Sequence, residues 1–310
     1  MRINDPDIFR VIAESLQIGV YVTDRDRRIV FWNREAVRIS GYLSHEVVGK
    51  CCGDALLTHC DADGKILCIS QCPMNKAMQE GAPQEARVFL HHRAGHRVPV
   101  RVRAFPVRGS DGAVIGAVEV FEEQASAVQS ERHLDMLAMH ELIDRDTGLP
   151  NRAIMQSYVR GRLELYTEHK LPVGVLLIQI VHTSEFQAAH SREALKAILH
   201  VVARSISHAL GVDCLLGHWS DDQFLALIPD CNLVDLERLG RQVRQLVSCS
   251  GMRWWGDELS VAIEAGYAIS EEGDDVGSLL HRAQHSLERA REAGIPSRSV
   301  RTQGDQQSGS

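Results

Sequence analysis

Apolar and polar residues alternate with a period of two in the first part of the chain. Over residues 96–106, Val98, Val100 and Val102 alternate with polar residues that include Arg97 and Arg101. This pattern is typical of a strand in an antiparallel sheet that has one buried and one solvated face. It therefore predicts a sheet covered on one side only.

The same criteria predict further elements up to residue 122. We expect helices at 5–16, 34–40, 44–48 and 73–79, and strands at 19–23, 28–32, 85–91, 96–106 and 114–121.

A different pattern follows residue 144. Residues 173–181 (VGVLLIQIV) form an almost continuous apolar run, which suits a central strand buried on both faces. Two short strands at 215–219 and 223–228 flank the polar turn Ser220-Asp221-Asp222, a hairpin signal. Helices are expected at 152–168, 191–210, 233–248 and 276–293, and a strand at 259–268. Strands alternating with helices predict an α/β (α+β) sheet flanked by helices.

Residues 122–143 contain no Pro or Gly and predict a helix between the two parts. Met136, Met139 and Ile143 fall on one stripe of that helix, which favours pairing with a second copy and hence a homodimer. The alternative is a helix packed on its own domain. We therefore divide the chain into domains at 1–122 and 144–300, a helical linker at 123–143, and a disordered Gln-, Ser- and Gly-rich tail at 301–310.

Composition narrows the classes of function. The 310 residues are 44% hydrophobic and 24% charged, with a net charge of -7 and no Lys/Arg run, so a nucleic-acid partner is not expected. No apolar run reaches the length of a membrane span, and the N-terminus lacks the apolar core of a signal peptide. We therefore expect a cytoplasmic protein without a membrane partner. Its eight cysteines should then be thiols or metal ligands rather than disulfides.

Five of the eight cysteines fall between residues 51 and 72, next to a histidine. Thiolates with an imidazole suit zinc or an iron–sulfur cluster, and we choose Cys52, His59, Cys68 and Cys72 as the metal ligands. Cys51 and Cys60 could replace Cys52 and His59 in that set. A thiol redox switch, a heme on His59 and buried inert thiols are the alternatives.

The first part of the chain resembles a PAS sensor domain. The likeness rests on GVYVTDRDRRIVFWNREAVRISGY at 19–42 and on HRAGHRVPVRVRAFPVRGSDGAVIGAVEVF at 92–121. The resemblance implies an antiparallel sheet with small helices that holds a ligand, a cofactor or nothing. It also implies a sensing role.

The second part resembles the GGDEF, or diguanylate cyclase, domain. The likeness rests on DRDTGLPNR at 144–152, on the hairpin, and on AQHSLERAREAG at 283–294. Where the family has Gly-Gly-Asp-Glu-Phe, this chain has Ser220, Asp221, Asp222, Gln223 and Phe224. The resemblance implies a reaction that joins two GTP molecules with the help of two metal ions.

The resemblance also implies that several working positions are altered. Gln179 stands where the family has a metal-binding Asp on the central strand, although Asp222 keeps the carboxylate of the turn. Gln187 and Lys196 stand where the family recognises guanine, and Lys196 offers donors where guanine needs an acceptor. Arg291 can stand for a phosphate-binding Lys, as the one nucleotide contact that we expect to remain.

The remaining inhibitory and phosphate motifs are also changed. Ile295 replaces an Arg of the closing helix, and residues 211–214 read Gly-Val-Asp-Cys instead of the family's inhibitory Arg-x-x-Asp. We therefore expect a degenerate, non-catalytic domain that acts by dimerisation or by contact with another signalling protein or an active cyclase. A weak cyclase or GTP hydrolase that uses Asp222, Arg291 and magnesium is one alternative, and a nucleotide receptor is the other.

Overall fold

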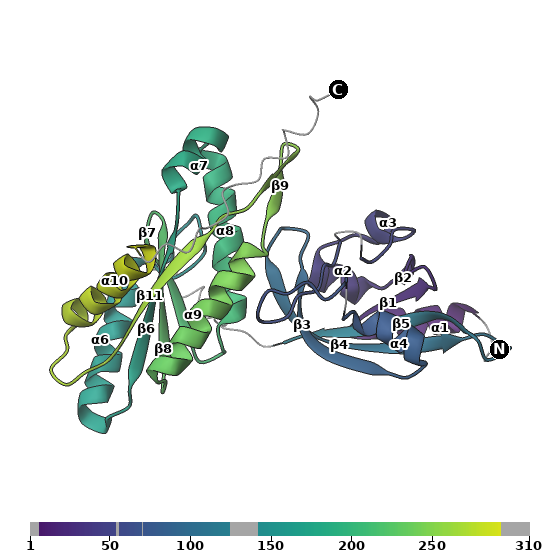
Figure 1. Cartoon of the computed structure of the whole chain (residues 1–310), viewed down its shortest axis with the longest axis horizontal. Coiled ribbons are helices and arrows are strands. Elements are labelled where there is room, and N and C mark those ends of the chain that lie inside the picture. Colours follow the sequence, from purple (N-terminus) through teal and green to yellow (C-terminus); the bar gives the residue numbers. More distant parts are fainter. Residues whose placement is uncertain (1–5, 54–55, 70, 125–141, 293–310) are drawn as a thin grey trace. The chain divides into compact units, whose positions relative to one another are not determined.

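The computed structural model describes residues 6–53, 56–69, 71–124 and 142–292 (Figure 1). The chain divides into two compact units, residues 1–124 and 125–310. In the described part, no helix combines the length and the apolar character that spanning a bilayer requires.

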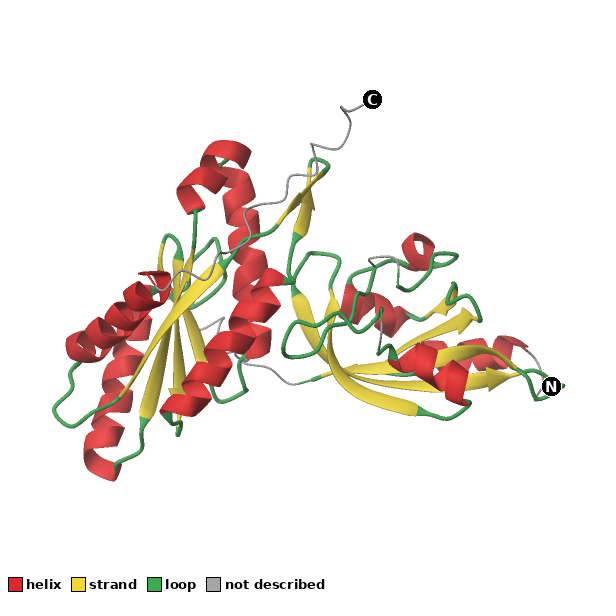
Figure 2. Ribbon diagram, in the orientation of Figure 1, coloured by secondary structure: helices red, strands yellow, loops and turns green. Residues whose placement is uncertain are grey.

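The first domain is built on one five-stranded antiparallel sheet with the strand order β2-β1-β5-β4-β3 (Figure 2). The strands are β1 (Gly19–Asp24), β2 (Ile29–Trp32), β3 (Gln84–His91), β4 (Arg97–Arg108) and β5 (Val114–Glu123). The helices are α1 (Pro6–Ser15), α2 (Arg34–Ser40), α3 (Ser44–Val47) and α4 (Pro73–Glu80). The predicted elements of this domain are confirmed to within two residues at nearly every end.

The alternation in β4 produces the expected buried face, with one exception. Val98, Val100 and Val102 are buried, and Arg101 lies at the surface, where it pairs with Glu85 of the neighbouring strand. Arg97 does not follow the pattern, because its side chain is buried and donates a hydrogen bond to the Thr58 carbonyl oxygen. The long Arg97 side chain reaches this backbone acceptor in the loop, so the buried guanidinium group has a hydrogen-bond partner.

The second domain contains a four-stranded antiparallel sheet in the order β11-β6-β8-β7. Its strands are β6 (Val173–Ile180), β7 (Leu215–Ser220), β8 (Gln223–Pro229) and β11 (Ile263–Ile269). Its helices are α6 (Arg152–His169), α7 (Thr183–His190), α8 (Arg192–Ala209), α9 (Leu233–Ser248) and α10 (Val276–Glu292). Helices α6 and α10 pack on one face and α9 on the other (Figure 2). The prediction of a sheet flanked by helices is confirmed.

Two predictions of elements in this half were incomplete or wrong. Helix α7 was missed, because its residues are mostly polar and Ser191, at φ 101°, separates it from α8. The strand predicted at 259–268 starts only at Ile263, and Leu259 instead ends a small separate hairpin, β9 (Met252–Trp254) with β10 (Asp257–Leu259). The turn of that hairpin places Trp255 at φ 50° and Gly256 at φ 102°.

The predicted linker helix at 122–143 is wrong at both ends. Glu122 and Glu123 continue β5, and Ile143 forms a bridge with Pro150 instead of a helical turn. The rest of that prediction, including Met136 and Met139, lies outside the described residues.

The entry to the second domain is joined by backbone hydrogen bonds to the strand that leads into the hairpin. The Asn151 N–H donates to the Leu142 carbonyl at 2.8 Å, and the His218 N–H of β7 donates to the Pro150 carbonyl, also at 2.8 Å. Asn151 also caps α6 by accepting from the Ile154 N–H. The first described residues of this domain are thereby fixed to β7.

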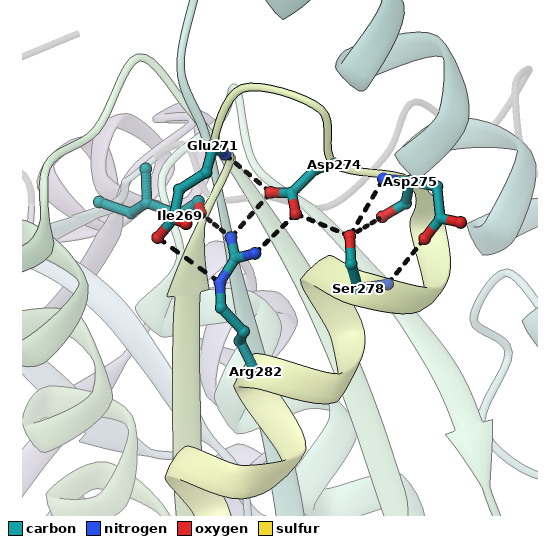
Figure 3. Close-up of polar contacts among 6 residues, drawn as sticks. All are labelled: Ile269, Glu271, Asp274, Asp275, Ser278 and Arg282. Atoms are coloured by element: carbon teal, nitrogen blue, oxygen red, sulfur yellow. Dashed lines mark hydrogen bonds and ion pairs between the residues drawn. The ribbon is translucent and has the colours of Figure 1, made fainter.

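A polar network begins helix α10 (Figure 3). Both guanidinium η-nitrogens of Arg282 donate to the carboxylate of Asp274, at 2.6 and 2.7 Å, and one of them also donates to the Ile269 carbonyl. Asp274 also accepts from the Glu271 N–H and from the Ser278 hydroxyl, each at 2.7 Å. The Asp274 side chain is only 5% exposed, so this bidentate pair fixes the connection from β11 to α10.

Candidate functional site

The signature hairpin of the second domain has the predicted shape. Strands β7 and β8 are paired, with Ser220 opposite Gln223, so that Asp221 and Asp222 form a two-residue turn. The Ser220 hydroxyl donates to the Gln223 side-chain oxygen at 3.1 Å. Phe224 is fully buried and anchors β8 in the core. At the tip of the hairpin, Asp221 is exposed and Asp222 is half-buried.

Asp222 is already engaged by a side chain of β6, which is itself bound by a side chain of α10. The Gln179 amide nitrogen, on β6, donates to Asp222 Oδ2 at 3.0 Å, and the Arg291 guanidinium, on α10, donates to Gln179 Oε1 at 3.4 Å. A magnesium ion needs oxygen ligands and usually a carboxylate charge. Here the position opposite Asp222 presents an amide donor. The residues present do not fit a metal pair at this turn.

The two residues predicted to replace the guanine contacts lie on different helices. Gln187 is exposed on α7, and Lys196 is exposed on α8. The Lys196 ammonium lies 2.8 Å from the carboxylate of Asp146, in the entry segment. The cation is thus paired with the chain itself, and Lys196 presents donors rather than an acceptor to a guanine edge.

The entry segment and β7 also share a half-buried acid–imidazole contact. His218 Nδ1 lies 3.0 Å from Asp144 Oδ2, and Asp144 accepts from both the backbone N–H and the hydroxyl of Thr147. Burial opposes ionisation of Asp144, but the hydrogen bonds from Thr147 and the His218 contact still lower its pKa. The Arg152 guanidinium lies over the Trp219 ring, 4.6 Å from its centroid. These contacts position the hairpin without any ligand.

The cysteine-rich region of the first domain forms a second candidate site. Cys52, His59 and Cys72 are buried, and Cys68 is half-buried. The His59 N–H donates to the Cys68 sulfur at 3.2 Å, and Cys72 occupies the N-cap position of α4. Cys52, Cys68 and Cys72 lie close enough to Glu119 of β5 that, in addition to burial, the carboxylate raises the pKa of each thiol. The fold therefore gathers the predicted residues around one carboxyl group.

Glu119 is the residue of this site that sequence reasoning missed. It is 1% exposed, and it accepts a hydrogen bond from the Tyr21 hydroxyl at 3.0 Å. His59 Nε2 lies 4.0 Å from Glu119 Oε1, and Glu119 Oε2 is buried without a hydrogen-bond partner among the described residues. The available signal was its position in β5, on the same face as the buried Ala117 and Phe121.

Burial controls the protonation of this cluster. It raises the pKa of Glu119 to about 7, against the opposing effect of the Tyr21 hydrogen bond. Burial also lowers the pKa of His59 to about 4, with Arg97 as a second cause, and raises the pKa of the Cys68 thiol to about 11. At neutral pH the imidazole is thus uncharged, and the thiol keeps its proton.

This arrangement does not match a formed metal centre. Within the described ranges, which leave out residues 54, 55 and 70, no three His, Cys, Asp or Glu side chains are placed so that they could hold a metal ion. Metal-binding thiols must also lose their protons, which burial disfavours for Cys52, Cys68 and Cys72. The zinc or iron–sulfur hypothesis therefore stays a prediction for direct metal analysis.

Comparison with known families and proteins agrees with both resemblances. The family described as "Diguanylate cyclase, GGDEF domain" matches residues 141–296, and the family described as "PAS fold" matches residues 13–129. The chain is 22% identical to the probable diguanylate cyclase DgcE of Escherichia coli, over 85% of this chain and 23% of that protein. It is 26% identical to the diguanylate cyclase DgcP of Pseudomonas aeruginosa, over 61% of this chain and 28% of that protein.

The chain therefore spans about a quarter of the length of these two relatives. A solved structure of the diguanylate cyclase SiaD in complex with its activator SiaC, from Pseudomonas aeruginosa, overlaps 53% of this chain and 66% of that chain. Its TM-score is 0.49 at 25% sequence identity.

Proposed function

Because the chain belongs to the GGDEF family and carries a PAS fold ahead of that domain, we propose that it is a signalling protein whose GGDEF domain is non-catalytic. In this proposal the second domain acts through dimerisation and protein contacts. The first domain controls those contacts in response to a signal.

The observation that carries the proposal is the chain of hydrogen bonds from Arg291 through Gln179 to Asp222. The family's reaction needs metal ions between the turn, the central strand and a triphosphate. In this chain the corresponding groups bind one another. Lys196, paired with Asp146, adds a cation at the position that should accept from guanine.

The test is formation of a cyclic dinucleotide from GTP by the full chain, with magnesium or manganese. We expect no product above the level of an Asp222→Ala variant, which removes the remaining signature carboxylate. Product formed at a rate clearly above that variant contradicts the proposal.

Two other functions start from the same residues. A weak cyclase or GTP hydrolase would use Asp222 and Arg291, and a nucleotide receptor would bind GTP without turnover. Equilibrium binding of GTP with magnesium to the full chain, compared with the Asp222→Ala variant, separates the three. Binding that depends on Asp222 and leads to turnover supports the enzyme, Asp222-dependent binding without turnover supports the receptor, and no Asp222-dependent binding supports the non-catalytic regulator.

A homodimer is part of this proposal. Its support is the sequence stripe of Met136, Met139 and Ile143, of which the first two lie outside the described residues. Sedimentation should show a dimer at about 10 µM, a range in which a useful signalling dimer holds together. Met139→Asp should weaken it by placing a charge in an apolar seam, whereas Ser130→Asp, off the stripe, should not. A wild-type monomer at that concentration contradicts this part.

The sensing cluster of the proposal is the set of thiols around Glu119. Metal analysis and an absorption spectrum of anaerobically purified protein test whether zinc or an iron–sulfur cluster binds there. If metal binds, Cys68→Ser and Cys72→Ser should each lower the content sharply, whereas Cys214→Ser, Cys231→Ser and Cys249→Ser should not. Metal-free protein ends the metal hypothesis and leaves a thiol-based or purely structural role.

A cytoplasmic location also belongs to the proposal. It is supported by the eight cysteines, all of which are free thiols in the structure. Cell fractionation tests it, and recovery in a secreted or periplasmic fraction contradicts it.

A further inference from the structure

A groove runs beside β11, the strand at one edge of the second domain's sheet. It lies between α9 and α10 and has a volume of about 840 Å³; Figure 1 shows β11 between these two helices. Small residues from all three elements form part of its lining, which leaves it hollow: Gly240, Ala265, Ser286 and Ala290. Its volume falls in the range of sites that hold small organic ligands.

The groove collects cationic side chains from both helices. Arg241 and Arg244 project from α9 and Arg289 from α10, and Tyr267 of β11 lies among them. Burial and the hydrogen bond to Glu237 raise the pKa of Tyr267, while the charges of Arg241 and Arg289 act in the opposite direction. Both guanidinium groups therefore lie within electrostatic reach of the same hydroxyl.

Two acidic groups near these arginines already have partners in or beside the groove. Glu237 accepts from the Tyr267 hydroxyl at 3.1 Å, and Glu264 pairs with Arg244 Nη2 at 2.9 Å. Arg244 Nε is buried without a hydrogen-bond partner among the described residues. Across those same residues, no carboxylate forms an ion pair with Arg241 or Arg289. The groove thus holds two unpaired guanidinium groups and one unsatisfied buried donor.

We propose that this groove binds a nucleoside phosphate, with Arg241 and Arg289 holding the phosphate. Two guanidinium groups from different helices favour a multivalent anion, and their planar forks match phosphate oxygens. The carboxylates of Glu237 and Glu292, which also line the groove, can accept from hydroxyl and amine groups of the nucleoside. A bare phosphate would fill only part of the space.

This site is separate from the signature turn. Gln179 and Asp222 do not line the groove, and Arg291 is directed to Gln179 instead. Binding should therefore not require a metal ion, and it does not depend on whether the turn is catalytic. Measurements in EDTA remove divalent metal ions, so they report binding in the groove without metal-dependent binding at the signature turn.

The test is calorimetric titration of the full chain, in EDTA, with GMP, AMP and inorganic phosphate. We expect saturable binding of at least one nucleotide, and weaker binding of inorganic phosphate. Arg241→Gln and Arg289→Gln should each weaken nucleotide binding about tenfold or more, because each removes charge-assisted hydrogen bonds. Arg204→Gln, an exposed arginine on α8, and Gln179→Ala should leave it unchanged.

Three results overturn the proposal. They are no saturable binding of either nucleotide at millimolar concentration, inorganic phosphate binding as tightly as the nucleotides, and binding that survives in both arginine variants. Circular dichroism confirms that each variant is folded. Arg289→Lys gives a second measurement, since it keeps the charge but loses the fork and should bind less tightly than the wild type.

Discussion

In the first domain, Glu119 lies inside the sheet at 1% exposure, with His59 and Arg97 also buried near it. Among the described residues of the second domain, no Asp, Glu, Lys or Arg is buried as a whole residue, and the carboxylate of Asp274, at 5% side-chain exposure, is paired with Arg282 where β11 ends. A charged group inside a core is unfavourable unless it is paired or neutralised. Chains keep such groups chiefly where they serve a function. The buried ionisable group at Glu119 therefore makes the first domain the part whose stability should depend on pH near neutrality.

The largest effect that tests this comparison is a pH dependence set by Glu119. Its pKa is about 7 in the folded chain, against an ordinary 4.5, so between these values the folded state holds a proton that the unfolded state has lost. The contribution of Glu119 to the stability of the first domain should therefore fall by about 3 kcal/mol as pH rises from about 5 to about 8, while His59, with its pKa lowered to about 4, contributes in the opposite direction. Glu119→Gln should remove the Glu119 contribution, so the stability of this variant should rise more steeply with pH than that of the wild type.

Hydrogen exchange of peptides from β1 and β5, followed by mass spectrometry at several pH values, measures the effect within the full chain. Glu122→Gln is the control, because that carboxylate is exposed and pairs with Arg103 at the surface. Protection of β1 that changes with pH in the same way in the wild type and in Glu119→Gln contradicts the assignment.

A smaller effect is expected at the network that begins α10. Asp274→Asn removes the charge that Arg282 binds with two hydrogen bonds, and should destabilise the second domain by about 2 kcal/mol. Asp235→Asn is the matched control, since its pair with Arg238 is exposed and should contribute under about 1 kcal/mol. Denaturant unfolding of both variants measures the difference, and equal midpoints would show that the network is not stabilising.

The same network has the opposite pH dependence to Glu119. Hydrogen bonds from Arg282, then from Ser278 and the Glu271 backbone, lower the pKa of Asp274 from 3.8 to about 2. This stabilisation is complete above about pH 4 and is lost as pH falls toward 2. Asp274→Asn should therefore flatten the acid limb of the stability curve of the second domain.

The smallest expected effect is at the signature turn. Gln179→Asp places a second carboxylate beside Asp222, with a loss of stability below about 1 kcal/mol in the absence of metal. Titration with manganese should show a weak site that the wild type lacks, because oxygen ligands then face each other. No cyclic dinucleotide should form, since Lys196 still offers no acceptor to guanine. Product from this variant would mean that the metal ligand alone had been limiting.

Sequence reasoning succeeded where a local pattern determines the structure. The hairpin followed from two apolar runs around an acidic turn, and β6 from its apolar run. It failed where a side chain depends on a distant segment. Arg97 is buried because the Thr58 carbonyl accepts from it, and Trp255 turns a hairpin in a left-handed conformation that its sequence does not signal.

In the candidate sites, too, features of the local sequence could be predicted, whereas contacts between distant segments could not. The loss of a metal ligand at Gln179 could be predicted from a resemblance, but its hydrogen bond from Arg291, 112 residues away, could not. The cysteines drew attention by their density. Glu119 did not, because its importance arises only when β1, β5 and the cysteine loop come together.

The hydrogen bonds of Leu142 with Asn151, and of Pro150 with His218, have a mechanical consequence. A pull on the backbone at Leu142 reaches β7 through this short path, without first deforming the apolar core. Strand β7 ends at Ser220, so the pull is delivered close to Asp221 and Asp222. The entry segment is thus coupled to the hairpin through these two backbone hydrogen bonds. A displacement of Leu142 would therefore move the exposed turn residue Asp221.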